Sequence, residues 1–211
     1  MGLTGLFGFP WAALAGFLLT ALIFEITPGP NVAYLSMLAA TQGRRIGMMG
    51  VIGVTLGLSV VGVAAMAGLS ALLQGTPVLM HALRLAGAAY LFWLAWETWK
   101  GADPKAPSDK LEMTGPEAFI HGFILNLLNP KTLLFYAVVL PGFVPIGPQM
   151  VWHTMMLVVF TICLSTSYHT LLVMLAGAAQ GHLVRSRRRH SLRRAMAVAL
   201  AGVAVWFALR S

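Results

Sequence analysis

The sequence predicts an all-α integral membrane protein with six transmembrane helices. Hydrophobic residues make up 58% of the 211 residues and charged residues only 9%, whereas charged residues reach about 25% in ordinary soluble domains. The apolar residues fall into six stretches, each long enough for the roughly 20 residues that a spanning helix needs. Basic residues gather in the loops on one side of these stretches, as they do in membrane proteins.

Charge clusters and Gly/Pro breaks delimit the expected spans. The longest connection, 101–117, contains Pro, Asp and Lys and is expected to be a solvated linker. It would divide one polytopic domain, 1–211, into a first repeat at 1–100 and a second at 118–211. The first and fourth spans are expected to be interrupted. The six spans are predicted at 8–40, 46–72, 78–99, 118–140, 150–176 and 194–210.

The distribution of basic residues predicts the topology. The loops at 44–45, 100–110 and 185–194 hold eleven of the fourteen basic residues, and six crossings place these three loops on one side. Positive loops remain in the cytoplasm, so both termini are expected outside. The net charge of +8 is therefore interpreted as a topological and lipid-headgroup anchor, and nucleic acid is not an expected partner.

The segment TPGPN, 27–31, interrupts the first apolar stretch. Pro28 and Pro30 lack N–H donors, and Gly29 can adopt conformations closed to other residues, so a regular helix is not expected to continue through them. Lipid cannot satisfy the backbone groups that a break exposes, and such backbone is tolerated only in a protein interior or beside a water-filled cavity. The break, with Asn31 directly after it, is therefore a candidate substrate site.

The second half repeats this pattern in the fourth apolar stretch, where NPK at 129–131 follows Asn126. Asn126, Asn129, Pro130 and Lys131 lie at about the same expected depth as the first break. Because each half contains three helices, the two halves would enter the membrane from opposite sides. Inverted repeats with broken helices are typical of secondary transporters, whose substrate sites lie near the midplane.

Three ionisable residues, Glu25, Arg84 and Lys131, fall within predicted spans. Such groups are costly in lipid and usually face a bundle interior or an aqueous cavity, so all three are candidate binding or coupling residues. Two readings of Arg84 stay open, since a long side chain near a helix end also snorkels to the interface. Tyr168 and His169 are expected either to line a polar path or to make an interhelical hydrogen bond.

Several functions are disfavoured by what the sequence lacks. The histidines show no HxxxH or HxxE spacing, so no metal site is expected. No nucleophile and base pair or HExxH motif appears, so an enzyme is not expected. The single cysteine, Cys163, excludes an intramolecular disulfide, and no cofactor is expected. The glycines of the second apolar stretch, at 47, 50, 53 and 57, are expected to pack closely against another helix.

The chain resembles the LysE/RhtB family of bacterial amino-acid exporters over nearly its full length. The resemblance is carried by TPGPN at 27–31, GRRIG at 43–47, LAGAAYLFWLAWETWK at 85–100 and GFILNLLNPKTLLFY at 122–136. One departure is PGFVP at 141–145, where family members often have Gln after the first Pro. The resemblance implies a six-helix carrier of the inner membrane that exports amino acids or close derivatives, in exchange with protons. It identifies as motif residues Pro28, Gly29, Pro30, Asn31, Asn129, Pro130 and Lys131.

The mechanism expected is alternating access around the two breaks. Amides following Pro30 would attract the substrate carboxylate, and Lys131 or Arg84 would add positive charge. Asn126 and Asn129 would form further hydrogen bonds, and Glu25 would bind the amino group or the coupling proton. A carrier of another small solute or metal cation, and a membrane assembly protein without a transport cycle, remain alternatives. Homo-oligomerisation also remains open.

Overall fold

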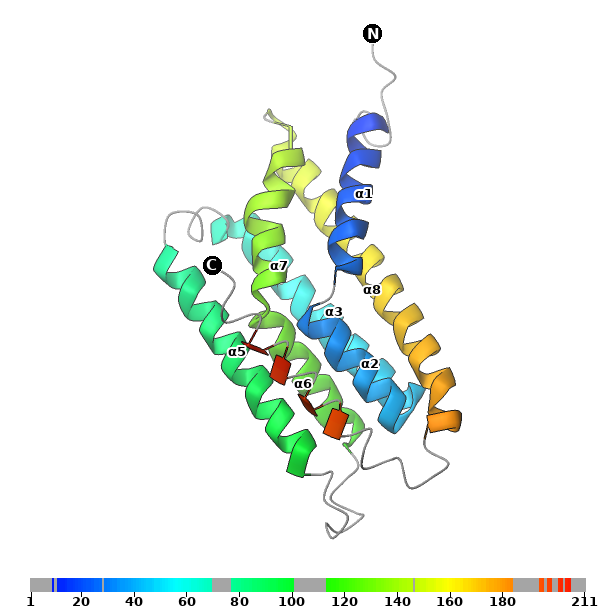
Figure 1. Ribbon diagram of the computed structural model, residues 1–211. Coiled ribbons are helices and arrows are strands. Elements are labelled where there is room, and N and C mark those ends of the chain that lie inside the picture. The colour runs from blue at the N-terminus through cyan, green and yellow to red at the C-terminus, as the bar shows by residue number, and fades with distance from the viewer. Residues whose placement is uncertain are drawn as a thin grey trace.

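The computed structural model describes residues 9, 11–27, 29–69, 77–100, 113–145 and 147–183, together with 194–195, 197–198, 201–202 and 204–205. In this part of the chain all regular structure is helical, which confirms the predicted all-α class. The elements, drawn in Figure 1, are α1 (Trp11–Ile26), α2 (Pro30–Gln42), α3 (Arg44–Ala64), η2 (Ala65–Leu69), α5 (Pro77–Lys100), α6 (Gly115–Leu127), α7 (Pro130–Leu134), η4 (Phe135–Val139), η5 (Leu140–Phe143) and α8 (Met150–Leu183).

Two helices among the described residues are long and apolar enough to cross a membrane, Arg44–Gly68 and Met150–Ala178. The number rises to four if α1 with α2, and α6 with Pro130–Phe143, each form one bent span. The third expected segment corresponds to α5, and the sixth falls on residues of which the structure describes only part. The count of six spans therefore stays a prediction.

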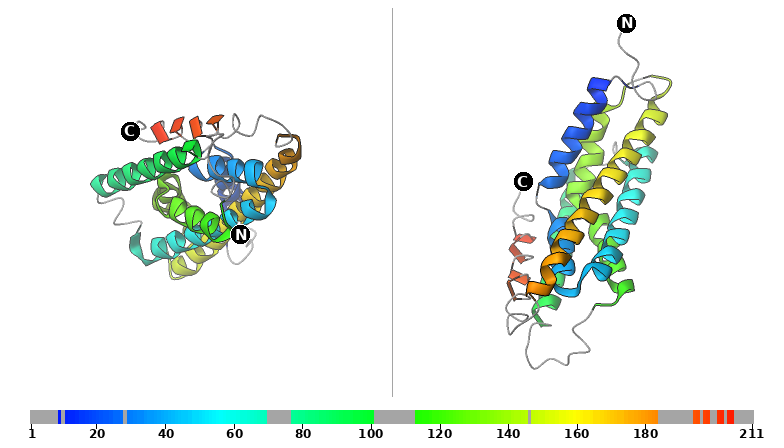
Figure 2. Two further views of the ribbon diagram at one scale, coloured as in Figure 1. Left: turned by 90° about the horizontal axis from the view of Figure 1, so that it is seen from below. Right: turned by 90° about the vertical axis from the view of Figure 1, so that its right-hand side faces the viewer.

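The two bent helix pairs run in opposite directions. In Figure 1, α1 and α2 descend from the N-terminal end, whereas α6 and α7 ascend beside them, and the side view of Figure 2 shows the same course. The axis changes by 58° between α1 and α2 and by 44° between α6 and the segment that begins at Pro130. Both bends lie part-way along the bundle (Figure 1).

Local sequence explains where the helices around the bends begin. Pro30 and Pro130 each occupy the first turn of a helix, where a missing N–H leaves no hydrogen bond unmade. The Asn129 side chain caps α7 by accepting a hydrogen bond from the amide of Lys131 at 3.0 Å. Pro28, a residue of the predicted site, lies outside the described part of the chain.

Two helices extend beyond the expected limits of their spans. The linker was expected to reach residue 117, but α6 begins at Gly115 because Thr114 and Glu117 form a capping box in which each side chain bonds the other residue's amide. Helix α8 extends to Leu183, beyond the expected end at 176. No proline or charged residue interrupts the sequence there before Arg185.

The glycine-rich face of α3 brings its backbone against α6. A Cβ atom added to Gly53 would overlap the carbonyl oxygen of Phe119, and one added to Gly57 would lie 2.9 Å from the carbonyl oxygen of Phe123. From the other side, a Cβ at Gly122 would meet the carbonyl oxygen of Gly50. These contacts confirm that the glycines permit close helix packing.

Apolar side chains form two separate buried clusters. One includes Tyr34, Leu38, Val54, Leu125 and Val173, and the other includes Phe17, Leu58, Val61, Leu133, Phe135, Leu140 and Leu157. Along α1–α2, α6–α7 and α8, the chain passes from one cluster to the other through polar residues. The fold thus places a polar layer between two apolar clusters, at the level of the bends.

Candidate functional site

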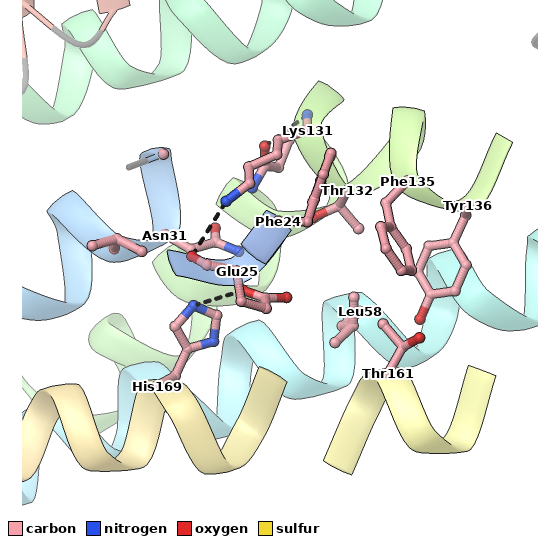
Figure 3. A pocket seen from close by; sticks show the side chains of 13 residues that line it. Phe24, Glu25, Asn31, Leu58, Lys131, Thr132, Phe135, Tyr136, Thr161 and His169 are labelled. Carbon is pink, nitrogen blue, oxygen red and sulfur yellow. Dashed lines mark hydrogen bonds and ion pairs between the residues drawn. The ribbon is translucent and has the colours of Figure 1, made fainter. Parts of the chain in front are cut away.

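A cavity lies in the polar layer, where α1, α2, α3, α7 and α8 meet. Its volume is about 20 Å³, which is room for about one water molecule. Figure 3 shows side chains from both halves of the chain converging on it. The polar and ionisable residues that line it are Glu25, Asn31, Asn129, Lys131, Thr132, Tyr136, Thr161 and His169.

The carboxylate of Glu25, in the last turn of α1, is directed toward α8 (Figure 3). Its Oε2 atom lies 3.8 Å from Nε2 of His169, an ion pair when the imidazole is protonated. The His169 side chain is fully buried, and its Nδ1 atom lies 3.3 Å from Oγ of Ser165, one turn earlier on the same helix. The carboxylate and the imidazole thus face each other inside the bundle without a direct hydrogen bond between them.

The ammonium of Lys131 is bound by main-chain oxygens at the C-terminal end of α1. Its Nζ donates to the carbonyl oxygen of Thr27 at 2.6 Å and to that of Glu25 at 3.4 Å. The same atom lies 5.1 Å from the ring centre of Phe24. Cations near a helix C-terminus are stabilised by its carbonyl groups, so Lys131 links the second break to the first.

A buried hydrogen-bond network also joins the two halves. Asn31 Nδ2 on α2 donates to Asn126 Oδ1 on α6 at 2.7 Å, and Thr132 Oγ1 on α7 donates to the same oxygen at 3.0 Å. The other amide atoms of the pair, Asn31 Oδ1 and Asn126 Nδ2, have no hydrogen-bond partner among the described residues. Buried polar groups are normally paired, so these atoms retain the capacity to bind a ligand or water.

The breaks supply two further features of the site. The amides of Asn31 and Val32 lie in the first turn of α2, where no carbonyl of the helix is available to them, and both residues line the cavity. A Cβ at Gly29 would lie 3.1 Å from Cδ of Lys131, a tight contact that the lysine side chain would have to relieve by a small shift. The lysine side chain therefore lies directly across the first break.

The predicted site residues fall into two groups. The structure brings together Glu25, Gly29, Pro30, Asn31, Asn126, Asn129, Pro130 and Lys131 around the two bends. Arg84 belongs to α5, but its side chain lies outside the described part of the structure, as does Pro28. Among the described residues, no group of three or more His, Cys, Asp or Glu side chains is arranged to hold a metal ion.

Sequence reasoning missed Phe24, Thr132 and Ser165, and it left His169 between two interpretations. The sequence did contain a signal for Ser165 and His169, because these residues are four positions apart and so share one face of α8. Phe24 has no such signal. An aromatic residue beside a glutamate in an apolar helix looks like any lipid-facing or core residue, and only its position over Lys131 distinguishes it.

Comparison with known proteins identifies relatives but no similar solved structure at a significant level. The chain is 31% identical over 124 residues to the threonine efflux protein of Escherichia coli (strain K12), a match covering 56% of this chain and 60% of that protein. Over 181 residues it is 25% identical to the leucine efflux protein of Enterobacter sp. (strain 638), covering 85% of this chain and 84% of that protein. The family described as LysE type translocator matches residues 22–211. The protein thus belongs to the LysE type translocator family.

Proposed function

We propose that this protein is a secondary transporter that exports amino acids or close derivatives across the bacterial cytoplasmic membrane, in exchange for protons. Family membership supports transport, and the names of the threonine and leucine efflux relatives support the substrate class. The proposal depends most on one observation. Two antiparallel bent helix pairs supply ionisable and amide side chains to one buried layer, the arrangement in which secondary transporters bind substrate.

The two apolar clusters support alternating access. A cavity of about 20 Å³ is too small for an amino acid, since it is room for about one water molecule. Substrate therefore enters only when one cluster separates, and it leaves when the other does. In this proposal the cluster containing Tyr34 and Leu38 opens toward the cytoplasm, and the cluster containing Phe17 and Phe135 opens toward the outside.

The proposed architecture is six spans in two inverted repeats, 1–100 and 118–211, with both termini outside the cytoplasmic membrane. The opposite courses of α1–α2 and α6–α7 support an inverted relation between the repeats (Figure 1). The basic loops support the orientation by the positive-inside rule, and they would contact lipid headgroups.

The proposed roles follow the geometry of the site. The free amides of the first turn of α2 attract the substrate carboxylate, and Lys131 or Arg84 adds positive charge. Asn126 and Asn129 supply hydrogen bonds to the bound substrate. Glu25 carries the coupling proton together with His169, whose ring nitrogen lies 3.8 Å from the carboxylate.

Transport into inside-out membrane vesicles tests this function. Export from the cell corresponds to uptake by such vesicles, so we expect an acidic lumen to drive uptake of one or more labelled amino acids. A protonophore should abolish this uptake, and vesicles without the protein provide the background. Absence of gradient-dependent uptake for every amino acid tested, or gradient-dependent uptake of a metal cation instead, would refute the proposal.

A further inference from the structure

Main-chain oxygens and one aromatic ring surround the Lys131 ammonium at the end of α1. We call this group the carbonyl cage, and it consists of the carbonyl oxygens of Glu25 and Thr27 and the ring of Phe24. Carbonyl oxygens accept hydrogen bonds and cannot donate them, and an aromatic face attracts cations. The cage is therefore matched to a primary ammonium group, which carries a positive charge and three N–H donors.

The carbonyl cage borders the cavity. Phe24, Glu25 and Lys131 all line the cavity wall, so a molecule in the polar layer lies beside two residues of the cage and beside the ammonium that occupies it. The lysine side chain reaches the cage across Gly29, where a Cβ would lie 3.1 Å from its Cδ. An α-amino acid carries a primary ammonium of the same charge and hydrogen-bonding capacity as the lysine.

We propose that the carbonyl cage binds the ammonium group of the substrate, and that Lys131 fills the cage between transport steps as an internal substitute for that group. The identity of the natural ligand rests on the proposed function. On binding, the substrate ammonium replaces the Lys131 ammonium, so the carbonyl oxygens stay paired and the charge in the cage is unchanged. Exchange of one cation for another avoids exposing unpaired carbonyl groups inside the membrane, which costs several kcal/mol per group.

This exchange favours zwitterionic substrates over simple amines. Once displaced, the Lys131 ammonium needs a new anionic partner, because an unpaired charge within a bundle is costly. An amino acid brings that partner as its own carboxylate, whereas a simple alkylamine does not. The cage therefore accepts amino acids in the native protein and excludes amines that lack a carboxylate. It also leaves the Glu25 carboxylate free of the ammonium, so that Glu25 and His169 can exchange the coupling proton.

Removal of the lysine ammonium tests the proposal without any transport measurement. We expect propylammonium to stabilise the Lys131→Ala protein in detergent, because the added amine fills the cage that the lysine has left. At ten times the dissociation constant the unfolding temperature, followed by tryptophan fluorescence, should rise by about 3–6 °C. The native protein should show no such rise. Adding Phe24→Leu to Lys131→Ala should weaken the effect, since it removes the ring beside the ammonium.

Two controls separate cage binding from nonspecific effects. Tetramethylammonium has the same charge but no N–H donor, so it should stabilise neither protein. Thr161→Ala opens space on another wall of the cavity and should create no response to propylammonium. If Lys131→Ala does not accumulate, Lys131→Met retains most of the side-chain volume and vacates only the position of the nitrogen, so it is tested with the ammonium ion.

Equal responses of native and variant proteins to the amine, or a response to tetramethylammonium as large as to propylammonium, would overturn the proposal. The outcome is independent of transport. A selective amine response together with no gradient-driven uptake would refute the proposed function and retain the cage. Gradient-driven uptake with no amine response would refute the cage and retain the proposed function.

Discussion

The hydrogen-bond network of Asn31, Asn126 and Thr132 allows the stability of the site to be separated from its function. Asn126 Oδ1 accepts two hydrogen bonds, one from Asn31 and one from Thr132. The exposed fractions of the three residues are 8%, 0% and 8%, so bulk water does not reach the network. Asn126→Leu preserves the approximate shape of the side chain and leaves both donors unpaired.

The cost of Asn126→Leu follows from two unpaired buried donors. In soluble proteins each unpaired group costs about 1–3 kcal/mol. Interhelical hydrogen bonds in membrane proteins contribute less, about 0.6 kcal/mol on average and at most about 1.7 kcal/mol. Two such bonds therefore give an expected loss of about 1–3 kcal/mol. For a chain of this length that loss lowers the unfolding temperature by roughly 2–12 °C.

The matched comparison is the triple variant Asn31→Leu, Asn126→Leu and Thr132→Val, in which no partner of the network is left unpaired. Replacing all partners of a buried hydrogen bond by apolar groups of similar shape is nearly neutral. We expect the triple variant to recover most of the lost stability in thermal unfolding but to transport no substrate, because the polar atoms beside the cavity are gone. A triple variant as unstable as Asn126→Leu, or one that transports normally, would refute this reasoning.

Three further predictions concern packing, the first break and topology. Gly53→Ala should destabilise the α3–α6 contact by about 1–3 kcal/mol, whereas Gly142→Ala, where a Cβ meets nothing within 4 Å, should leave the unfolding temperature nearly unchanged. Changing Pro28 and Pro30 together to Ala should abolish transport while the protein still accumulates in the membrane, and normal export would mean that the prolines only kink the helix. Tags at either terminus should react with reagents outside the cytoplasmic membrane and a tag beside Arg188 only from inside, and the opposite pattern would remove the inverted-repeat proposal.

The helical class and much of the packing could be predicted from the sequence. The apolar composition indicated a membrane protein. The helical spacing of the glycines at 50, 53 and 57 indicated a close helix contact, but its partner, α6, is seen only in the structure. Helix ends were predicted less well. The capping box of Thr114 and Glu117 is a local signal, but it lies in a polar linker where no helix was expected.

The partners of the ionisable residues could not be predicted, because they depend on how each helix is rotated. Glu25 and Lys131 carry opposite charges beside the two breaks, but the sequence does not indicate which groups either side chain contacts. In the structure the Lys131 ammonium bonds main-chain oxygens and the Glu25 carboxylate faces His169. Backbone carbonyls carry no signature in a sequence, so a cation site built from them is visible only after the helix end has been located.

Coupling of proton movement to export through Glu25 is the central claim, and one comparison tests it most directly. Glu25→Gln keeps the shape of the side chain but cannot exchange a proton, so proton-driven net uptake into inside-out vesicles should be lost while one-for-one exchange of labelled for unlabelled substrate survives. Glu117→Gln, a change of the same kind in the exposed capping box of α6, should leave both activities intact. If Glu25→Gln retains proton-driven net uptake, or lowers net uptake and exchange equally, Glu25 does not carry the coupling proton and the account is contradicted.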